Sequence, residues 1–182
     1  MRDSGNAGGS AIYLNGQIVH TVNAPKFTLN NATLTTAGGA GMYMAGYGET
    51  VINGGSVTGD STTIELRAGT LKLNGGTYTA NAESYSYEAN GNGATTEGAA
   101  IAVMQHTTKK DLSVEINGGE FNGAMALAET NVQKNDPDPH VELSITDGTF
   151  NGGVTVDDCD NFITNGKFSS DVTKYCVTGK MA

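Results

Sequence analysis

The sequence predicts an all-β fold: a parallel β-helix (solenoid) of about six coils with a C-terminal cap. Three observations favour it. A glycine-centred phrase recurs along the chain, as in INGGSVTG at 52 and INGGEFNG at 116. A second phrase with alternating apolar letters lies between its copies, and the spacing of the copies is uneven. Units that cannot bury their apolar faces alone stack on their neighbours and share one core.

The glycine phrase predicts a sharp corner between two strands. Its first and sixth positions are apolar in every copy, and its fourth is glycine in all but the first. Glycine tolerates the positive φ that such a corner requires. The first-position residues are Leu29, Ile52, Leu73, Ile116, Ile145 and Ile163, the corner glycines are Gly55, Gly76, Gly119, Gly148 and Gly166, and the sixth-position residues are Leu34, Val57, Tyr78, Phe121, Phe150 and Phe168. We expect the sixth positions to form an internal stack that becomes aromatic toward the C-terminus.

The second phrase predicts a strand with one buried face, because its second and fourth letters are always apolar. The expected inward pairs are Ile12/Leu14, Met42/Met44, Ile64/Leu66, Ile101/Val103, Met125/Leu127 and Val154/Val156. The glycine phrases lie between 18 residues apart (145 to 163) and 43 apart (73 to 116). Corners of a solenoid accept loops of different length, whereas stacked strands do not. An antiparallel sandwich would share the composition but does not require two phrases in fixed order.

Composition is consistent with a single domain, in which 1–168 form the coils and 169–182 the capping segment. The chain has 26 glycines, 3 prolines and no tryptophan, which favours extended structure with tight turns. Its net charge of -9 disfavours nucleic acid as a partner. No apolar run approaches the ~20 residues of a spanning helix, so direct membrane insertion is not expected. Cys159 and Cys176 could pair or remain free thiols.

The closing segment ITNGKFSSDVTKYCVTGKMA and the copies ending in G-G-x-F or G-G-x-Y resemble a known family. They are similar to the right-handed, pectin-lyase-like β-helix regions of large cell-surface proteins from gut Firmicutes. The resemblance implies a right-handed solenoid, export, and attachment at a bacterial cell surface or cell wall. It implies no catalytic residue and no cofactor. We also expect further β-helix coils or domains in the same parent chain.

Two groups of residues are candidates for ligand binding. Tyr13, Tyr43 and Glu65 occupy the outward position of the second strand on successive coils, where they could form a flat platform for a sugar ring. Ordinary stacking between strands would explain them as well. Tyr85 and Tyr87 lie in the long loop 80–98, among small polar residues typical of binding loops. A tolerated insertion at a corner is the alternative for this loop and for the loop 128–140.

Catalytic and metal-binding signals are weak. Asp157, Asp158 and Asp160 form the one dense acidic group and are weak candidates for a metal site, although turn capping explains them equally well. His20, His106 and His140 fall in separate loops, which favours surface positions over a zinc site.

The function we expect is that of a non-catalytic extracellular module, an adhesin or display stalk for a glycan or host surface protein. The alternative is a polysaccharide lyase or glycoside hydrolase of the pectin-lyase-like class. Arginine is scarce, with two residues in the chain, and this disfavours the lyase chemistry, which needs a cation beside an acidic sugar.

Overall fold

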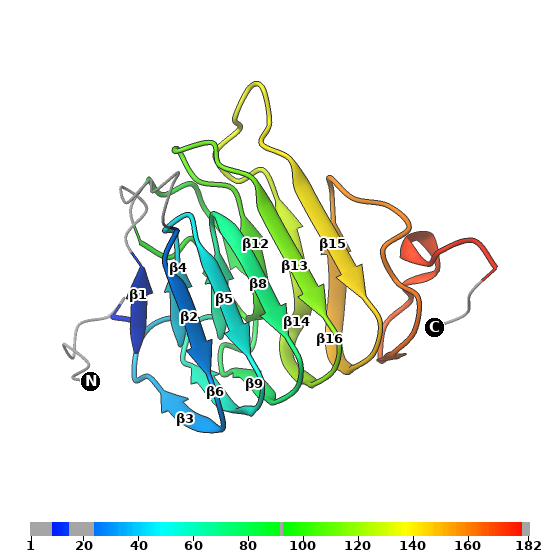
Figure 1. Ribbon diagram of the computed structural model, residues 1–182, viewed down its shortest axis with the longest axis horizontal. Coiled ribbons are helices and arrows are strands. Elements are labelled where there is room, and N and C mark those ends of the chain that lie inside the picture. The colour runs from blue at the N-terminus through cyan, green and yellow to red at the C-terminus, as the bar shows by residue number, and fades with distance from the viewer. Residues whose placement is uncertain (1–8, 15–23, 92, 180–182) are drawn as a thin grey trace.

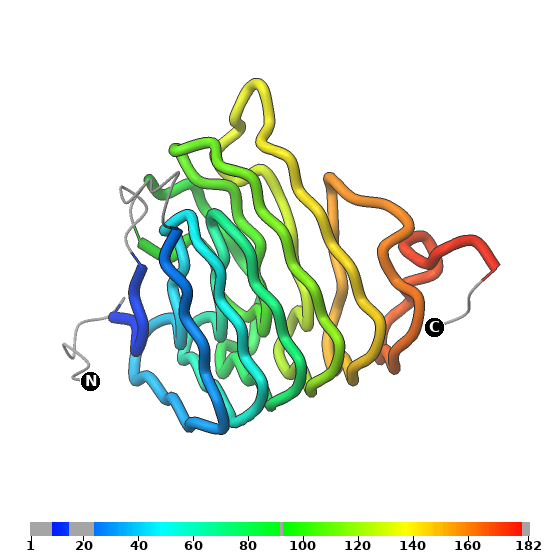
Figure 2. Tube along the Cα trace, in the orientation of Figure 1, coloured from blue at the N-terminus to red at the C-terminus, as the bar shows by residue number. Residues whose placement is uncertain are grey.

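The computed structural model describes residues 9–14, 24–91 and 93–179. Within these ranges the chain is all-β and forms a solenoid-like stack in which two curved parallel sheets face each other (Figures 1 and 2). The one helical element there is a 3-10 turn, η1 (Thr173–Tyr175). In the same residues no helix has the length and apolar character that crossing a membrane requires. The arrangement is compatible with the predicted β-helix.

The five-stranded sheet contains the strands that enter the glycine phrases. They are β2 (Lys26–Leu29), β5 (Glu49–Ile52), β8 (Gly69–Leu73), β13 (Leu112–Ile116) and β15 (Val141–Ile145). Every neighbouring pair is parallel. The register pairs Leu29 with Ile52 and carries the same position through to Ile145, which bridges Ile163. The predicted alignment of the first positions is therefore confirmed.

The ten-stranded sheet continues from the corners into the second phrase. Six of its strands are β1 (Ile12–Leu14), β4 (Met42–Met44), β7 (Ile64–Leu66), β12 (Ala99–Met104), β14 (Glu120–Thr130) and β16 (Thr149–Val156). The other four are β3 (Ala32–Thr35), β6 (Gly55–Gly59), β9 (Thr77–Ala80) and β17 (Lys167–Phe168). The long strands β14 and β16 join the two groups, because each spans both phrases of its coil.

The corners and the internal stack follow the repeat. All five predicted corner glycines have positive φ, from 94° at Gly55 to 143° at Gly166, and Asn31 has a φ of 56° in the first copy. At the sixth position the rings of Tyr78, Phe121, Phe150 and Phe168 stack in sequence, with centroids 5.0, 4.7 and 4.5 Å apart. This stack belongs to the apolar core that fills the space between the two sheets. The predicted aromatic column is confirmed.

An asparagine ladder runs along the outside of the same corners. The Nδ2 of Asn53 donates to Asn30 Oδ1 at 2.7 Å, Asn74 donates to Asn53 at 2.7 Å, and Asn117 donates to Asn74 at 3.1 Å. These residues hold the second position of the glycine phrase in four successive copies. Side-chain hydrogen bonds therefore link the coils in addition to the backbone pairing.

One coil departs from the expected register. Two irregularities in β14 displace it, so that Leu127, and not Met125, pairs with Ile101 and Val154. Met125 packs instead against a second apolar cluster that includes Ala102. The prediction that Met125 and Leu127 form an inward pair is wrong for Met125. As a result Glu129 aligns with Val103 on one side and Val156 on the other.

The closing residues pack against the last coil. Tyr175 is buried, its ring lies 5.1 Å from that of Phe162, and its hydroxyl accepts a hydrogen bond from the N–H of Val156 at 2.7 Å. Both cysteines are free thiols. The Sγ of Cys159 donates to the carbonyl of Val141 at 3.1 Å.

Candidate functional site

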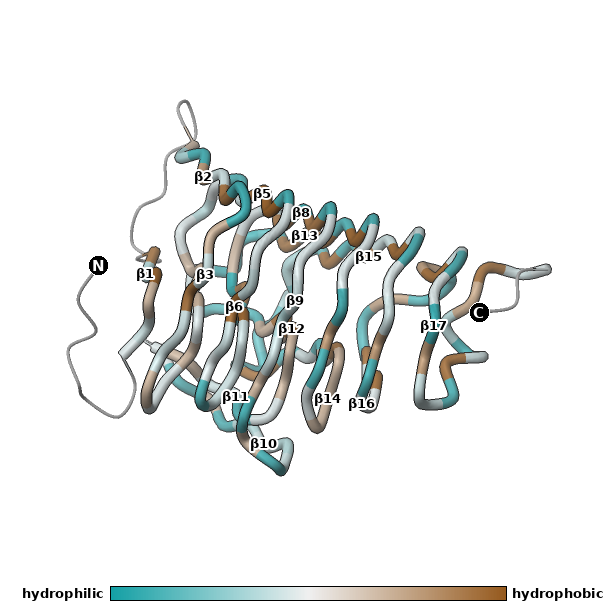
Figure 3. The backbone as a smooth tube through the Cα atoms, turned by 90° about the horizontal axis from the view of Figure 1, so that it is seen from below, coloured by the Kyte–Doolittle hydropathy of each residue, from teal (hydrophilic) through white to brown (hydrophobic). Residues whose placement is uncertain are grey.

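The long loop between the third and fourth coils folds back over the outward face of the ten-stranded sheet. It forms a hairpin of β10 (Ser86–Tyr87) and β11 (Thr96–Glu97), which pair antiparallel. The N–H of Asn81 donates to Gly59 at one end, and the N–H of Gly98 donates to Ser61 at the other. The hairpin projects from the side of the stack in Figure 3. We call residues 81–98 the insert.

A buried carboxylate fixes the insert to the sheet. Glu65 on β7 is 0% exposed, and both of its oxygens accept the N–H of Thr95 at 2.9 Å. The carboxylate also accepts the Thr95 hydroxyl at 2.8 Å and the N–H of Thr96 at 3.2 Å. Burial raises the pKa of Glu65, whereas Arg67 and the donors of Thr95 and Thr96 oppose the rise. Buried donors on the insert are thus satisfied by a side chain of the sheet.

Arg67 and Tyr43 complete this clamp. Arg67 Nε lies 3.8 Å from Glu65 Oε1, and its two Nη atoms donate to the carbonyls of Gly93 at 2.8 Å and Gln105 at 3.1 Å. The hydroxyl of Tyr43 accepts the N–H of Gly93 at 3.1 Å. Burial is the main cause that raises the pKa of Tyr43. Three side chains from β4 and β7 therefore hold residues 93–96 in one position.

The expected exposure of Tyr43 and Glu65 is wrong. The structure does place Tyr13, Tyr43 and Glu65 side by side on successive coils, and the two tyrosine rings stack with centroids 4.9 Å apart. However, Tyr43 is 1% exposed because the insert covers it, while Tyr13 remains 46% exposed. The alternation of the strand identified the outward side but not what lies upon it. Tyr43 and Glu65 position the insert.

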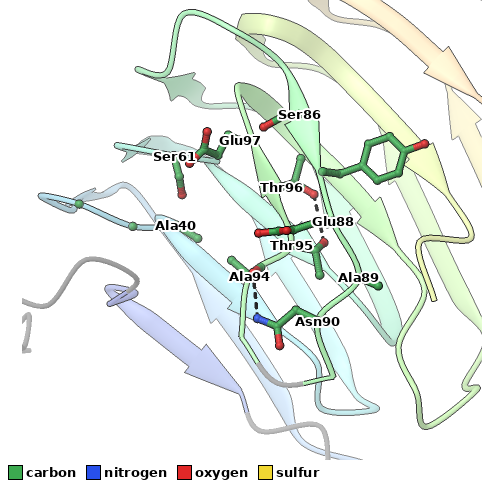
Figure 4. Close-up of a pocket in the computed structure, with 13 residues that line it drawn as sticks. Ala40, Ser61, Ser86, Glu88, Ala89, Asn90, Ala94, Thr95, Thr96 and Glu97 are labelled. Carbon is green, nitrogen blue, oxygen red and sulfur yellow. Dashed lines mark hydrogen bonds between the residues drawn. The ribbon is translucent and has the colours of Figure 1, made fainter.

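A cavity of about 800 Å³ opens between the insert and the corner that precedes β4. The insert contributes Tyr87, Glu88 and Glu97, and the stack contributes Ala40 and Ser61. The full lining is Gly38, Gly39, Ala40, Ser61, Ser86, Tyr87, Glu88, Ala89, Asn90, Ala94, Thr95, Thr96 and Glu97. The carboxylates of Glu88 and Glu97 lie on the side of the insert that faces Ala40 and Ser61 (Figure 4).

The two tyrosines predicted in this loop have different environments. Tyr85 is half-buried and packs against the apolar cluster that contains Ala102 and Ala128. Burial, followed by the nearby Tyr87 and acidic groups, raises the pKa of Tyr85 to about 12. Tyr87 is 49% exposed, lines the cavity, and lies 5.8 Å from the Tyr85 ring between centroids. Tyr85 therefore anchors the insert, and the half-exposed Tyr87 ring lies on the same face of the hairpin as Tyr85, opposite to Glu88 and Glu97.

The sequence did not single out the acidic and hydroxyl residues of the cavity. Glu88 and Glu97 stand nine positions from one another on the chain, and only the hairpin pairing brings them to one side. Ser61 comes from a different coil. The sole signal for them was the length of the loop.

The acidic run 157–160 surrounds a buried carboxyl that the sequence did not single out. The N–H groups of Asp157 and Asp158 both donate to Glu129 Oε2 at 2.9 Å, and Asp158 Oδ2 accepts Gln105 Nε2 at 3.1 Å. Burial, reinforced by the charge of Asp158, raises the pKa of Glu129 to about 7. Burial likewise raises the pKa of Cys159 to about 11, with contributions from Glu129, Asp158 and Asp160.

Metal-ligating groups do not converge in the part of the chain that the structure describes, where no three His, Cys, Asp or Glu side chains are placed to share an ion. His20 lies outside the described residues. His106 is buried, and its Nδ1 accepts the N–H of Thr108 at 3.2 Å, so its predicted surface position is wrong. His140 is exposed, as expected.

Comparisons of the chain with models of known protein families, with curated protein sequences and with solved structures give no match in any of the three.

Proposed function

We propose that this chain is a non-catalytic extracellular module of a bacterial surface protein, which acts as an adhesin or display stalk for a glycan or host surface protein. In this proposal the stack is a right-handed parallel β-helix of about six coils with a C-terminal cap, similar to the pectin-lyase-like surface regions of gut Firmicutes. The cavity of about 800 Å³ beneath the insert is the observation that carries the proposal.

The size and the lining of the cavity support ligand binding. Pockets that bury a small ligand have volumes of about 300–1,000 Å³ and combine apolar walls with a few polar groups. Here glycines and alanines form part of the wall, and the hydroxyls of Ser61 and Ser86 and the amide of Asn90 are polar. The hydroxyls of a sugar can form hydrogen bonds with such polar groups.

The clamp on the insert supports display as the mechanism. Glu65, Arg67 and Tyr43 are all buried and together bond the backbone of residues 93–95. The wall of the cavity is therefore ordered when the protein folds. A ligand then binds with little further loss of conformational entropy, which is the usual advantage of a preorganised site.

The enzymatic alternative has less support. The closest approach to an acid and base pair is Glu129 with Asp158, but Glu129 is 0% exposed and its Oε2 already accepts two backbone N–H groups. A catalytic carboxyl must reach the substrate directly or through one water. No residue of the cavity lining is basic among those described, whereas lyase chemistry on acidic sugars needs a cation.

Screening on a glycan array and on an array of purified extracellular matrix proteins tests the proposal. We expect a ligand whose binding falls in Glu97→Ala, with thermal stability unchanged because Glu97 is exposed. Glu142→Ala is the matched control, since Glu142 is also exposed but does not line the cavity.

Three results would count against this function. Absence of any ligand on both arrays removes its basis, and a ligand that is lost in Glu142→Ala but retained in Glu97→Ala places the site elsewhere. Release of unsaturated or reducing products from polygalacturonate would favour the lyase or hydrolase.

A further inference from the structure

We infer that Asn165 is a site of spontaneous deamidation, in which its side-chain amide becomes the carboxylate of aspartate or isoaspartate. In four of the glycine corners asparagine directly precedes glycine, a neighbour without the side chain that would hinder attack on the amide. Three of these asparagines hold the second position of the phrase, and one holds the third. They are Asn53, Asn74 and Asn117 at the second position and Asn165 at the third.

The reaction takes place between two adjacent residues and consumes one water. The backbone nitrogen of Gly166, after losing its proton to solvent, attacks Cγ of Asn165, and the side-chain nitrogen leaves as ammonia. Water then opens the resulting succinimide. Opening at Cγ gives aspartate, whereas opening at the backbone carbonyl gives isoaspartate, in which the main chain runs through Cβ and Cγ. The rate therefore depends on how readily the nitrogen and Cγ approach one another.

The preceding coil shows the geometry of a side chain at the third position. Asp147 stands there, and its Oδ1 accepts the N–H of the next residue, Gly148, at 2.8 Å. This hydrogen bond draws the side-chain carboxyl toward the nitrogen of the following residue. Gly148 and Gly166 have similar φ, 138° and 143°, and the strands that follow them pair in parallel register. The corner at Asn165 therefore favours the same approach.

Nothing in the described part of the chain holds the Asn165 side chain away from that nitrogen. The residue is exposed, and its side chain forms no hydrogen bond with any residue that the structure describes. Asn53 and Asn74 are exposed as well, and both also precede glycine. Exposure and the dipeptide are thus alike at the two kinds of position, and the bonding of the amide is what differs.

The asparagine ladder holds the second-position amides along the stack. The Nδ2 of Asn74 donates to Asn53 at 2.7 Å, and its Oδ1 accepts the Nδ2 of Asn117 at 3.1 Å. Asn117 also donates to Glu115 and accepts the hydroxyl of Thr146. Each hydrogen bond that must break before attack slows the reaction about two- to tenfold, so we expect Asn165 to react at least about tenfold faster than the asparagines of the ladder.

The modification alters the last corner of the stack. It adds a negative charge, and isoaspartate also adds one carbon to the backbone that leads to Phe168. The ring of Phe168 ends the aromatic column, 4.5 Å from that of Phe150 between centroids, and the N–H of Lys167 donates to Gly148 at 2.8 Å. The longer backbone therefore acts on the end of the column and on its pairing with the preceding coil.

Peptide mapping by mass spectrometry tests the inference on the folded protein, sampled over time at pH 8. Fragmentation that separates aspartate from isoaspartate locates the reaction, and Asn165→Gln, which can close only a less favourable six-membered ring, identifies its signal. The same mapping in concentrated guanidinium chloride is the control, because the unfolded chain presents all four pairs alike. Asn74→Ser interrupts the ladder, so deamidation of Asn53 should rise, whereas Asn117 retains Glu115 and Thr146 and should not change.

The expected result is that Asn165 reacts faster than the three ladder asparagines in the folded protein, by the factor given above, and at a similar rate after unfolding. Equal rates in the folded protein, or a ladder asparagine that reacts faster than Asn165, overturn the inference. A difference that persists after unfolding assigns the selectivity to sequence and overturns its structural cause. An unchanged rate at Asn53 in Asn74→Ser overturns the protection by the ladder.

Discussion

Glu129 provides a direct test of the register of the stack. In the structure it stands between Val103 and Val156 on neighbouring coils, is fully buried, and its Oε2 accepts two backbone N–H groups. Its Oε1 has no hydrogen-bond partner within the described part of the chain. Burying a charged carboxyl in such a place costs more than burying a neutral amide, even one whose NH2 group lacks a partner. We therefore expect Glu129→Gln to stabilise the protein at alkaline pH.

The magnitude follows from the raised pKa. Burial moves the pKa of Glu129 from an ordinary value of 4.5 to about 7, so the folded state binds more protons than the unfolded state in this range. The contribution of Glu129 to the free energy of unfolding is then fully present below about pH 4.5 and is lost as pH rises through 7. Because each pKa unit corresponds to about 1.36 kcal/mol, the shift from 4.5 to about 7 amounts to about 3 kcal/mol.

Unfolding in guanidinium chloride, followed by circular dichroism at pH 4.5 and pH 8, measures this difference. The wild type should lose about 3 kcal/mol more than Glu129→Gln between the two values, and at pH 8 the variant should melt roughly 6–12 °C higher for a chain of this size. Titrating groups that do not interact with Glu129 are common to both proteins and cancel. Parallel pH profiles for wild type and variant would refute the buried position of Glu129. The exposed Glu142→Gln is the control.

Three further substitutions, together with Gly54→Ala as a control, test the stack and the clamp. Phe121→Ala removes the centre of the aromatic column and should cost about 3–5 kcal/mol by chemical denaturation. Gly55→Ala should cost at least about 1–2 kcal/mol of unfolding free energy, because φ is 94° and the added carbon would overlap the Ala32 carbonyl. Its control is Gly54→Ala, where the nearest atom to the added carbon is 3.3 Å away, and it should cost under about 0.5 kcal/mol. Glu65→Ala leaves Arg67 as an unpaired buried charge, so we expect a loss of about 3–5 kcal/mol together with faster proteolysis within residues 86–94; unchanged cleavage would contradict the clamp.

The stack could be predicted because every coil places the same structural requirements on equivalent residues, and these requirements recur in the sequence. Parallel coils place equivalent residues above one another, so a requirement at one position, such as the positive φ at Gly119, recurs as the same letter in the next coil. Side chains that fill one column must also be similar in kind, as Phe121 and Phe150 are. Corners, inward faces and the aromatic stack were therefore visible in the alignment.

The register of β14 was not visible, for a reason specific to strands. The segment AMALAET alternates over several residues, and a shift by two leaves Leu127 inward and brings Glu129 to the place expected of Leu127. The apolar pattern therefore fitted two alignments of β14 with its neighbouring strands equally well. The prediction used the one in which Met125 and Leu127 form the inward pair and Glu129 follows that pair. The irregularities on either side of Met125 select the other alignment.

The cover over the outward face could not be predicted either. Tyr43 and Tyr13 hold equivalent positions, and nothing local to the strand indicates that residues 93–96 lie on one and not on the other. From the sequence alone, Tyr43→Ala with Tyr85→Ala would be expected to weaken ligand capture without loss of stability. Because Tyr43 is buried beneath the insert, we now expect that pair of changes to lower the stability as well.

The side-chain amides of the asparagine ladder all point the same way along the stack, each donating to the asparagine of the preceding coil. This polarity is separate from the direction of the backbone. Lys72 bonds both oxygens of Glu115 and is the main cause that lowers the pKa of that carboxyl. The ionised carboxylate can only accept, so Asn117 must turn its amide hydrogens toward Glu115, and its Oδ1 is left to accept the hydroxyl of Thr146. The orientation of this one amide is therefore fixed by a charge.

Each amide further along is then fixed by its neighbour. Asn74 must present its oxygen to Asn117 and its hydrogens to Asn53, and Asn53 does the same toward Asn30. The four side chains form a row of aligned dipoles, in which reversing one member would set oxygen against oxygen or hydrogen against hydrogen. The ion pair between Lys72 and Glu115, which joins two neighbouring coils, thus orders polar groups as far away as Asn30, and replacing Asn74 would divide the row into two parts that no longer share an orientation.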